Sequence, residues 1–366
     1  MKRFLKCAAL FLAPLALLCG VFFAAVWRSG ELCDYEAGAH ASAAGEISLF
    51  GLAYRDNTAS FKRAAANDVK ADLLVLGTSR SMQLRGQFFD TDSFYNAGGG
   101  MAFLPQAAAF LEALDEDARP ERLILVLDQY FFNEQWLAAD NASSVPDYTQ
   151  FADPDPGYLL HAFFDAYSYG KYRILDVLQT PADVVGLSAS ARGAGFYPDG
   201  SYSYGTDATG DGLDPGFADS INRILTASNR FEHGKVVAQQ GVEDLRAVLD
   251  VCREYGIEVT AFLPPYAPSV WQYMQDYGEH TYMTQIYDTI VPVFEEYGYE
   301  VFDCSYLPET TDDQYLDGFH GSDRVYAAIC VRLARDSQLL SDVFDEARLT
   351  ALFEQDGPPK VISFGE

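Results

Sequence analysis

Basic residues are scarce in this chain, and its cysteines show no metal-binding pattern. Its 366 residues include 25 Lys and Arg against 53 Asp and Glu, for a formal net charge of −28. Because nucleic acids and anionic lipid surfaces are bound through basic patches, this balance argues against both as partners. None of the six cysteines belongs to a Cys-x-x-Cys pair, so no metal knuckle is expected, and no cofactor is indicated.

One long apolar run lies at the amino terminus. It covers residues 7–27 without a charge, close to the ~20 residues that span a bilayer. Such a run is a transmembrane helix or a signal peptide. Its length, and the lack of a small-x-small cleavage site at its end, favour an uncleaved anchor. Lys2, Arg3 and Lys6 precede it, so the positive-inside bias places the amino terminus in the cytoplasm and the remainder outside.

The rest of the chain divides into three segments. After the anchor at 1–30, we expect a membrane-proximal tether at 31–70, in which the Ala/Gly/Ser-rich stretch 37–45 is flexible. From 71 to 345, short apolar strands alternate with amphipathic helices, which predicts a mainly parallel sheet with helices on both faces, a three-layer α/β/α fold. A tail follows at 346–366.

The alternation gives specific elements. Strands are predicted at 73–76, 123–127, 259–263 and 300–302, and helices at 105–114, 242–255, 283–297 and 324–336. Between 140 and 235 the pattern fails in a stretch rich in Tyr, Phe, Gly and Asp. We expect this insertion to form a cap or side wall over the site, with aromatic side chains that either stack on sugar rings or form a small satellite core.

Two short motifs, far apart in the chain, supply the parts of an activated serine. The first, Gly-Thr-Ser-Arg at 77–80, follows the apolar run 73–76 and presents Ser79 at the end of a strand. The second, Asp-Gly-Phe-His, places Asp317 three residues before His320. Among the five histidines, only this one has a carboxylate motif beside it. The motifs therefore predict a nucleophile, a general base and a carboxylate that orients the base.

Acyl transfer also needs donors for the developing oxyanion. The amide of Ser79 is one candidate, and the run Gly98, Gly99 and Gly100 is another, because glycine lets backbone amides approach a ligand closely. Arg80 could support the substrate or the loop, or pair with a surface carboxylate.

These blocks resemble those of an SGNH-type hydrolase domain. Residues 77–79 match the first block, 96–100 the second, and 317–320 the terminal Asp-x-x-His, so the resemblance covers 71–337. The chain is more similar still to the membrane-anchored branch that includes the D-alanyl-lipoteichoic-acid transfer protein and polysaccharide O-acetylation partners. The resemblance implies an SGNH/flavodoxin-like fold.

One block departs from the family pattern. Where the hydrolases carry Asn as an oxyanion donor, this chain has Asp128 followed by Gln129. An ionised carboxylate cannot donate, so either Gln129 substitutes, Asp128 is protonated, or the oxyanion hole has fewer donors.

The resemblance implies a serine O-acyltransferase outside the cytoplasm that modifies an envelope polysaccharide or teichoic acid. It also implies a multi-span membrane-bound O-acyltransferase as partner. Two alternatives stay open: an esterase that uses the same residues with water as acceptor, and a non-catalytic glycan-binding scaffold of an acylation complex.

Overall fold

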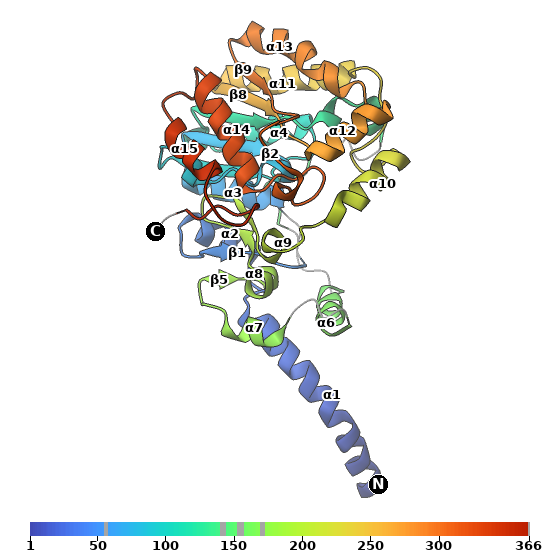
Figure 1. The fold of residues 1–366 in the computed structure, drawn as a ribbon. Helices are drawn as coiled ribbons and strands as arrows, with labels where there is room; N and C mark the ends of the chain where they lie inside the picture. The colour runs from blue at the N-terminus through green and yellow to red at the C-terminus, as the bar shows by residue number, and fades with distance from the viewer. Residues whose placement is uncertain (55–57, 140–143, 152–156, 169–172, 365–366) are drawn as a thin grey trace.

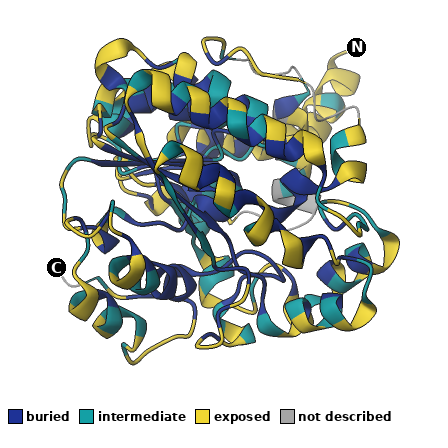
Figure 2. Ribbon diagram, turned by 90° about the horizontal axis from the view of Figure 1, so that it is seen from above, coloured by how far each residue is buried: buried dark blue, intermediate teal, exposed yellow. Residues whose placement is uncertain are grey.

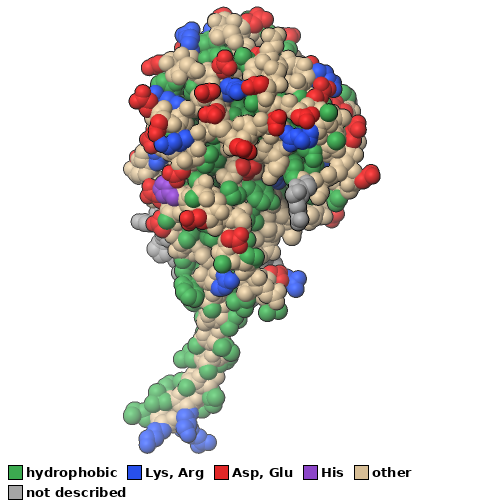
Figure 3. Space-filling view, turned by 90° about the vertical axis from the view of Figure 1, so that its left-hand side faces the viewer, with side chains coloured by type: hydrophobic (Ala, Val, Ile, Leu, Met, Phe, Trp, Pro, Cys, Tyr) green, Lys and Arg blue, Asp and Glu red, His purple; other side chains and the backbone are tan. Residues whose placement is uncertain are grey.

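A computed structural model describes residues 1–54, 58–139, 144–151, 157–168 and 173–364. Its first helix, α1 (Lys2–Arg28), is long and apolar enough to cross a membrane, judged by length and composition alone. Figure 1 shows α1 projecting from the rest of the chain as a separate stalk. Figure 3 shows the stalk covered by apolar side chains with basic ones at its tip, and many acidic side chains over the body.

A five-stranded parallel sheet forms the centre of the fold. Its order is β3-β2-β4-β8-β9, and every neighbouring pair is parallel. The strands are β2 (Leu73–Gly77), β3 (Phe94–Gly98), β4 (Arg122–Val126), β8 (Glu258–Leu263) and β9 (Glu300–Asp303). The four predicted strands are confirmed. Mainly apolar runs are typical of strands that are buried on both faces of a parallel sheet.

Helices flank this sheet, and all of them except the short α5 bury side chains in the main core (Figure 2). They are α3 (Thr58–Val69), α4 (Leu104–Glu112), α5 (Glu134–Ala138), α11 (Gln239–Tyr255), α12 (Pro268–Tyr277), α13 (Ile286–Tyr297) and α14 (Asp323–Asp336). The four predicted helices are confirmed, although 283–285 forms a 3-10 turn before α13. Gly256 and Gly298 end α11 and α13 in the left-handed conformation, which glycine adopts without strain.

The segment expected to be a flexible tether is folded. It contains α2 (Tyr35–Ala43) and β1 (Leu49–Phe50). Within 37–45, Gly38 serves close packing, since a Cβ there would come within 2.5 Å of the Phe50 ring. That ring stacks on Phe61 of α3 at 5.0 Å between centroids. A composition typical of linkers therefore builds a close contact between a helix and an aromatic cluster.

Strand β1 joins the tether region to the insertion through a second, smaller sheet. Its order is β5-β1-β6-β7, with β5 (Val184–Val185), β6 (Ala194–Phe196) and β7 (Tyr202–Tyr204). The insertion also forms α6 (Tyr158–Ser168), α7 (Ile174–Gln179), α8 (Leu187–Arg192), α9 (Thr206–Thr209) and α10 (Ala218–Thr226). Parts of 140–235, namely 140–143, 152–156 and 169–172, lie outside the described residues. In Figure 1 this sheet lies between the parallel sheet and α1.

The carboxyl-terminal tail adds a last helix. Residues 346–353 form α15 (Glu346–Phe353), which packs on α14. The Asp345 side chain caps it by accepting from the Arg348 amide at 3.0 Å.

Candidate active site

The sequence motifs meet at the carboxyl-terminal edge of the parallel sheet. Ser79 follows β2, Asp128 follows β4, and Pro264 follows β8. Because parallel strands end at one edge, ligands of open α/β sheets bind there. The loop with His320 lies between β9 and α14 and reaches the same edge.

Two glycines let the turn with Ser79 sit on this edge. Gly77 and Gly98 are paired at the ends of β2 and β3. A Cβ at either position would come within 2.7 Å of the Ser81 hydroxyl oxygen, closer than packed atoms approach. Ser81 in turn donates to the Thr78 carbonyl at 2.8 Å and closes the turn. Gly98 therefore has a steric role beneath the nucleophile turn.

Ser79, His320 and Asp317 form one hydrogen-bonded line. The Ser79 Oγ atom lies 2.9 Å from His320 Nε2, and His320 Nδ1 lies 2.8 Å from Asp317 Oδ2. Since the carboxylate can only accept, it holds the Nδ1 proton and leaves Nε2 to take a proton from the serine. Both His320 and Asp317 are buried, while Ser79 is partly exposed. The three residues predicted as catalytic are thus joined through His320.

The spacing of the Asp-x-x-His motif is explained by its turn. Asp317 Oδ1 accepts from the backbone amides of Phe319 at 2.9 Å and His320 at 2.7 Å, so one carboxylate fixes both the turn and the imidazole. The His320 carbonyl accepts from the Leu316 amide at 2.8 Å and closes the loop. Burial alone would raise the pKa of Asp317, but His320 and these hydrogen bonds lower it below its ordinary value.

The insertion supports this loop from outside. The Gly318 amide donates to the Ser220 hydroxyl of α10 at 3.2 Å, and the Leu213 amide donates to the Leu316 carbonyl at 2.6 Å. Ser220 is itself held by Asp214, whose carboxylate accepts from both its amide and its hydroxyl at 2.8 Å. The region expected to wall the site therefore also positions the loop that carries the base.

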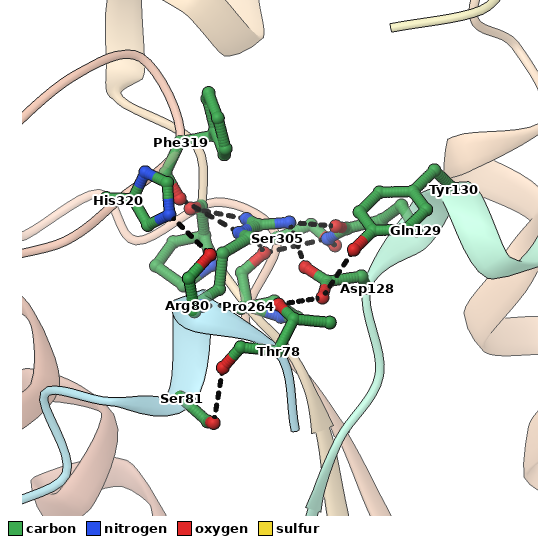
Figure 4. A network of polar contacts seen from close by, with 12 residues as sticks. Thr78, Arg80, Ser81, Asp128, Gln129, Tyr130, Pro264, Ser305, Phe319 and His320 are labelled. Carbon is green, nitrogen blue, oxygen red and sulfur yellow. Dashed lines mark hydrogen bonds and ion pairs between the residues drawn. The ribbon is translucent and has the colours of Figure 1, made fainter. Parts of the chain in front are cut away.

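Arg80 lies beneath the site in a buried ion pair. Its Nη1 atom is 2.9 Å from Asp128 Oδ1, and neither side chain is more than 2% exposed. Its Nε atom donates to the Phe319 carbonyl at 2.8 Å, next to His320 (Figure 4). Burial alone would lower the pKa of Arg80, but the Asp128 charge raises it above its ordinary value. The partner of Arg80 is thus an internal carboxylate, and the expectation of a surface carboxylate is wrong.

This ion pair accounts for the acid at position 128, where the resemblance led us to expect an oxyanion donor. Asp128 also accepts from the Thr78 hydroxyl at 2.6 Å and the Tyr130 hydroxyl at 3.3 Å, so its oxygens face the network in Figure 4. Gln129 accepts from Arg80 at 2.8 Å, and its amide donates to Pro264 at 2.7 Å and Ser305 at 3.0 Å. Both side chains are occupied in anchoring the nucleophile turn.

The candidate oxyanion donors differ in availability. The amides of Gly98, Gly99 and Gly100 all donate within the protein, at 2.7 Å to Asn96 Oδ1, 2.9 Å to the Gly77 carbonyl and 2.9 Å to the Ala97 carbonyl, respectively. The glycine run is therefore not free to bind an oxyanion in this conformation. Within the described ranges, the amide of Ser79 donates to no protein group. Of the predicted oxyanion donors, this amide stays available for a ligand.

Sequence reasoning placed Tyr204 in the aromatic insertion but did not single it out, and it lies beside His320. Its ring centroid is 6.3 Å from that of His320, and burial, with a contribution from Asp317, raises the pKa of its phenol well above the ordinary value. Tyr204 borders a cavity of about 780 Å³ with Arg85 and Tyr197, and a second of about 410 Å³. The alternating run 202–204 within the aromatic stretch is the signal that could have identified it.

No known family model matches the chain, and no curated protein is similar enough to match it. Among the described residues, no cluster of three or more His, Cys, Asp or Glu could hold a metal ion.

Proposed function

We propose that this chain is a serine-dependent O-acyltransferase that acts outside the cytoplasm on an envelope polysaccharide or teichoic acid. The observation that carries the proposal is the line from Ser79 through His320 to Asp317, with contacts of 2.9 and 2.8 Å. A nucleophile, a base and an orienting carboxylate in hydrogen-bond contact are the requirements for acyl-enzyme chemistry.

The mechanism uses the same base twice. Ser79 Oγ attacks the carbonyl carbon of an acyl donor while His320 Nε2 accepts its proton, and the Ser79 amide stabilises the oxyanion. The tetrahedral intermediate expels the donor's alcohol or thiol, which takes the proton from His320, and an ester on Ser79 remains. An acceptor hydroxyl then loses its proton to His320 and attacks this ester. Collapse of the second intermediate transfers the acyl group and returns the proton to Ser79 Oγ.

The family and fold assignment belong to this proposal. We assign the domain to the SGNH type, with a three-layer α/β/α arrangement, on the order of its motifs and the parallel sheet order β3-β2-β4-β8-β9. Helix α1 would be its single membrane span, with the amino terminus in the cytoplasm and the site outside. A multi-span membrane-bound O-acyltransferase would supply the acyl group across the bilayer.

Tyr204 is the proposed contact for the acceptor sugar. Its ring borders the cavity of about 780 Å³ and lies close to His320. An aromatic face beside a base can hold a sugar ring so that one hydroxyl points toward the imidazole. This arrangement would favour transfer to a glycan over transfer to water.

An esterase is the second candidate, and one observation favours it. Ser79 is partly exposed, so water has access to an ester formed there. The residues and the first chemical step would be the same, and only the acceptor would differ.

A fluorophosphonate probe tests the serine chemistry on the purified full-length protein. We expect the wild type to be labelled, Ser79→Ala not to be labelled, and His320→Ala to be labelled far more slowly. Ser341→Ala is the matched control, because Ser341 is an exposed serine outside this turn whose hydroxyl also donates to a backbone carbonyl, that of Gln338, at 3.0 Å. No labelling of the wild type at any pH would refute both enzyme functions and favour the scaffold.

The product then separates transferase from esterase. Cells that carry Ser79→Ala should lose acyl esters from an envelope polymer, whereas loss of an esterase should raise them. An unchanged or raised ester content in these cells would contradict the transferase.

A further inference from the structure

Two helices of the insertion expose apolar side chains beside the end of α1. Figure 1 shows α6 and α7 next to the end of the stalk that joins the body. Four of their large apolar side chains, each at least 46% exposed, form what we call the α6–α7 surface: Leu160, Phe164, Leu175 and Leu178. Within each helix the two side chains are neighbours on one face, because they lie four residues apart in α6 and three apart in α7. Apolar exposure grouped in this way marks a site that contacts a partner or a membrane.

The same helices pack against the last turns of α1. The ring of Phe22 meets that of Phe163 edge-on at 5.3 Å between centroids. One buried cluster contains three α1 residues and three from the insertion: Phe22, Ala25, Val26, Ala162, Val177 and Leu187. The insertion thus covers part of a helix that is otherwise exposed along most of its length.

The depth of this contact follows from helix geometry. At 1.5 Å per residue, the apolar run 7–27 is about 31 Å long, which matches the ~30 Å hydrocarbon core of a bilayer. Phe22 then lies roughly 8 Å inside the outer end of the run. A helix packed on Phe22 lies at the depth of an interfacial amphipathic helix, about 5–10 Å into the headgroup boundary. Trp27, 77% exposed, is at the level where aromatic side chains anchor proteins.

A buried carboxylate fixes the insertion to the end of α1. Glu31, three residues past the helix, accepts from the Leu187 amide at 2.6 Å, the Tyr158 hydroxyl at 2.6 Å and the Ala53 amide at 2.8 Å. Arg28 donates to the Thr180 carbonyl at 2.8 Å. These contacts hold α6 and α7 in one position relative to α1, so they cannot rise from the membrane independently of it.

We infer that the α6–α7 surface lies in the outer interface of the bilayer and fixes the height and tilt of the catalytic domain above it. The inference rests on the membrane anchoring given under Proposed function. The occupant is lipid, because the surface is continuous with a helix whose other faces must contact lipid at the same depth. Contact through apolar side chains needs no basic patch, which fits a chain of net charge −28. It should therefore not depend on anionic lipid.

Spin-label accessibility in vesicles tests the inference on the full-length chain. Single labels are placed by Phe164→Cys and Leu175→Cys, with Cys7, Cys19 and Cys33 replaced by Ser and the buried cysteines retained. Collision with oxygen reports lipid exposure, and collision with a soluble nickel chelate reports water. We expect both labels to show an oxygen-to-nickel ratio several-fold above that of an aqueous site, equally in zwitterionic and anionic vesicles.

Two controls separate the failure of this inference from the failure of the anchor. A label at Phe11→Cys, on the exposed middle of α1, reports whether that helix is in lipid. A label at Val236→Cys, exposed just before α11 in the catalytic domain, sets the aqueous value. All variants should keep fluorophosphonate labelling at the wild-type rate.

Each alternative result contradicts the inference in a different way. Labels 164 and 175 at the aqueous value, with the Phe11→Cys label in lipid, would refute the α6–α7 contact alone. An aqueous value at all four positions would refute the anchor as well. Protection of 164 and 175 only in native membranes, and not in pure lipid, would assign the surface to a protein partner and contradict lipid contact.

Discussion

Replacing Arg80 by methionine should destabilise the fold by at least about 3 kcal/mol, because removing one partner of a buried ion pair leaves the other charge uncompensated. Asp128 would keep only the hydroxyls of Thr78 at 2.6 Å and Tyr130 at 3.3 Å. The carbonyls of Phe319 and Pro265 would each lose the guanidinium donor that now lies 2.8 Å away. Against a typical total of about 5–15 kcal/mol, this is a large loss.

The double variant Arg80→Met, Asp128→Leu separates the cost of an uncompensated buried charge from the loss of the other Arg80 contacts. It removes both ions, so it should be more stable than Arg80→Met alone although it carries one more substitution. The matched control is Arg246→Met, which breaks an exposed pair with Glu296 and should change little.

Stability is measured by urea unfolding of the detergent-solubilised full-length protein, and site geometry by the rate of fluorophosphonate labelling. Arg80→Lys keeps the charge but loses the planar fork that reaches the Phe319 carbonyl, so its labelling should slow even where it stays folded. If Arg80→Met unfolds at the same urea concentration as Arg246→Met, or if the double variant is no more stable than the single one, the buried pair does not support the site as argued.

Three further predictions concern other buried or site-lining groups. Burial lowers the pKa of Lys62 well below its ordinary value, against the attraction of Asp199. Unfolding therefore takes up a proton, and this group's contribution to stability rises with pH up to about 10.4. Between about pH 7 and 9, the free energy of unfolding from urea titrations should rise by up to about 1.4 kcal/mol per pH unit more in the wild type than in Lys62→Met. Glu31→Gln turns an amide donor toward the Leu187 amide and should cost about 1–3 kcal/mol in the same assay. Tyr204→Ala should raise the acceptor KM by up to about tenfold, while Tyr204→Phe does not and neither alters fluorophosphonate labelling.

The central sheet was predictable because its signal is local. Runs such as 73–76 and 123–126 are apolar at every position, as is typical of a strand buried on both faces. Parallel order then places the ends of β2 and β4 at one edge, so the neighbourhood of Ser79 and Asp128 follows from topology. The Asp-x-x-His motif could also be recognised because its signal is local: a single turn holds both its carboxylate and its imidazole.

Contacts between distant segments were not predictable from composition. The stretch 37–45 looks like a linker because Gly, Ala and Ser are also the residues of flexible chains. Only the Phe50 ring against Gly38 distinguishes close packing from flexibility, and those residues are brought together by the fold. Gly98 was misleading in a similar way, because a glycine required under a turn and a glycine that binds a ligand look alike in sequence.

The role of Arg80 and the acid at 128, which sequence alone left open, are explained by one structural feature. Arg80 follows the nucleophile and Asp128 stands where a neutral donor was expected, and each would carry an uncompensated buried charge without the other. Neither change is therefore accessible singly without a large loss of stability. It follows that chains sharing this site should carry the arginine and the acid together or not at all. Asp128→Asn alone should weaken the loop of His320 instead of supplying an oxyanion donor, because the neutral amide would face the Arg80 guanidinium.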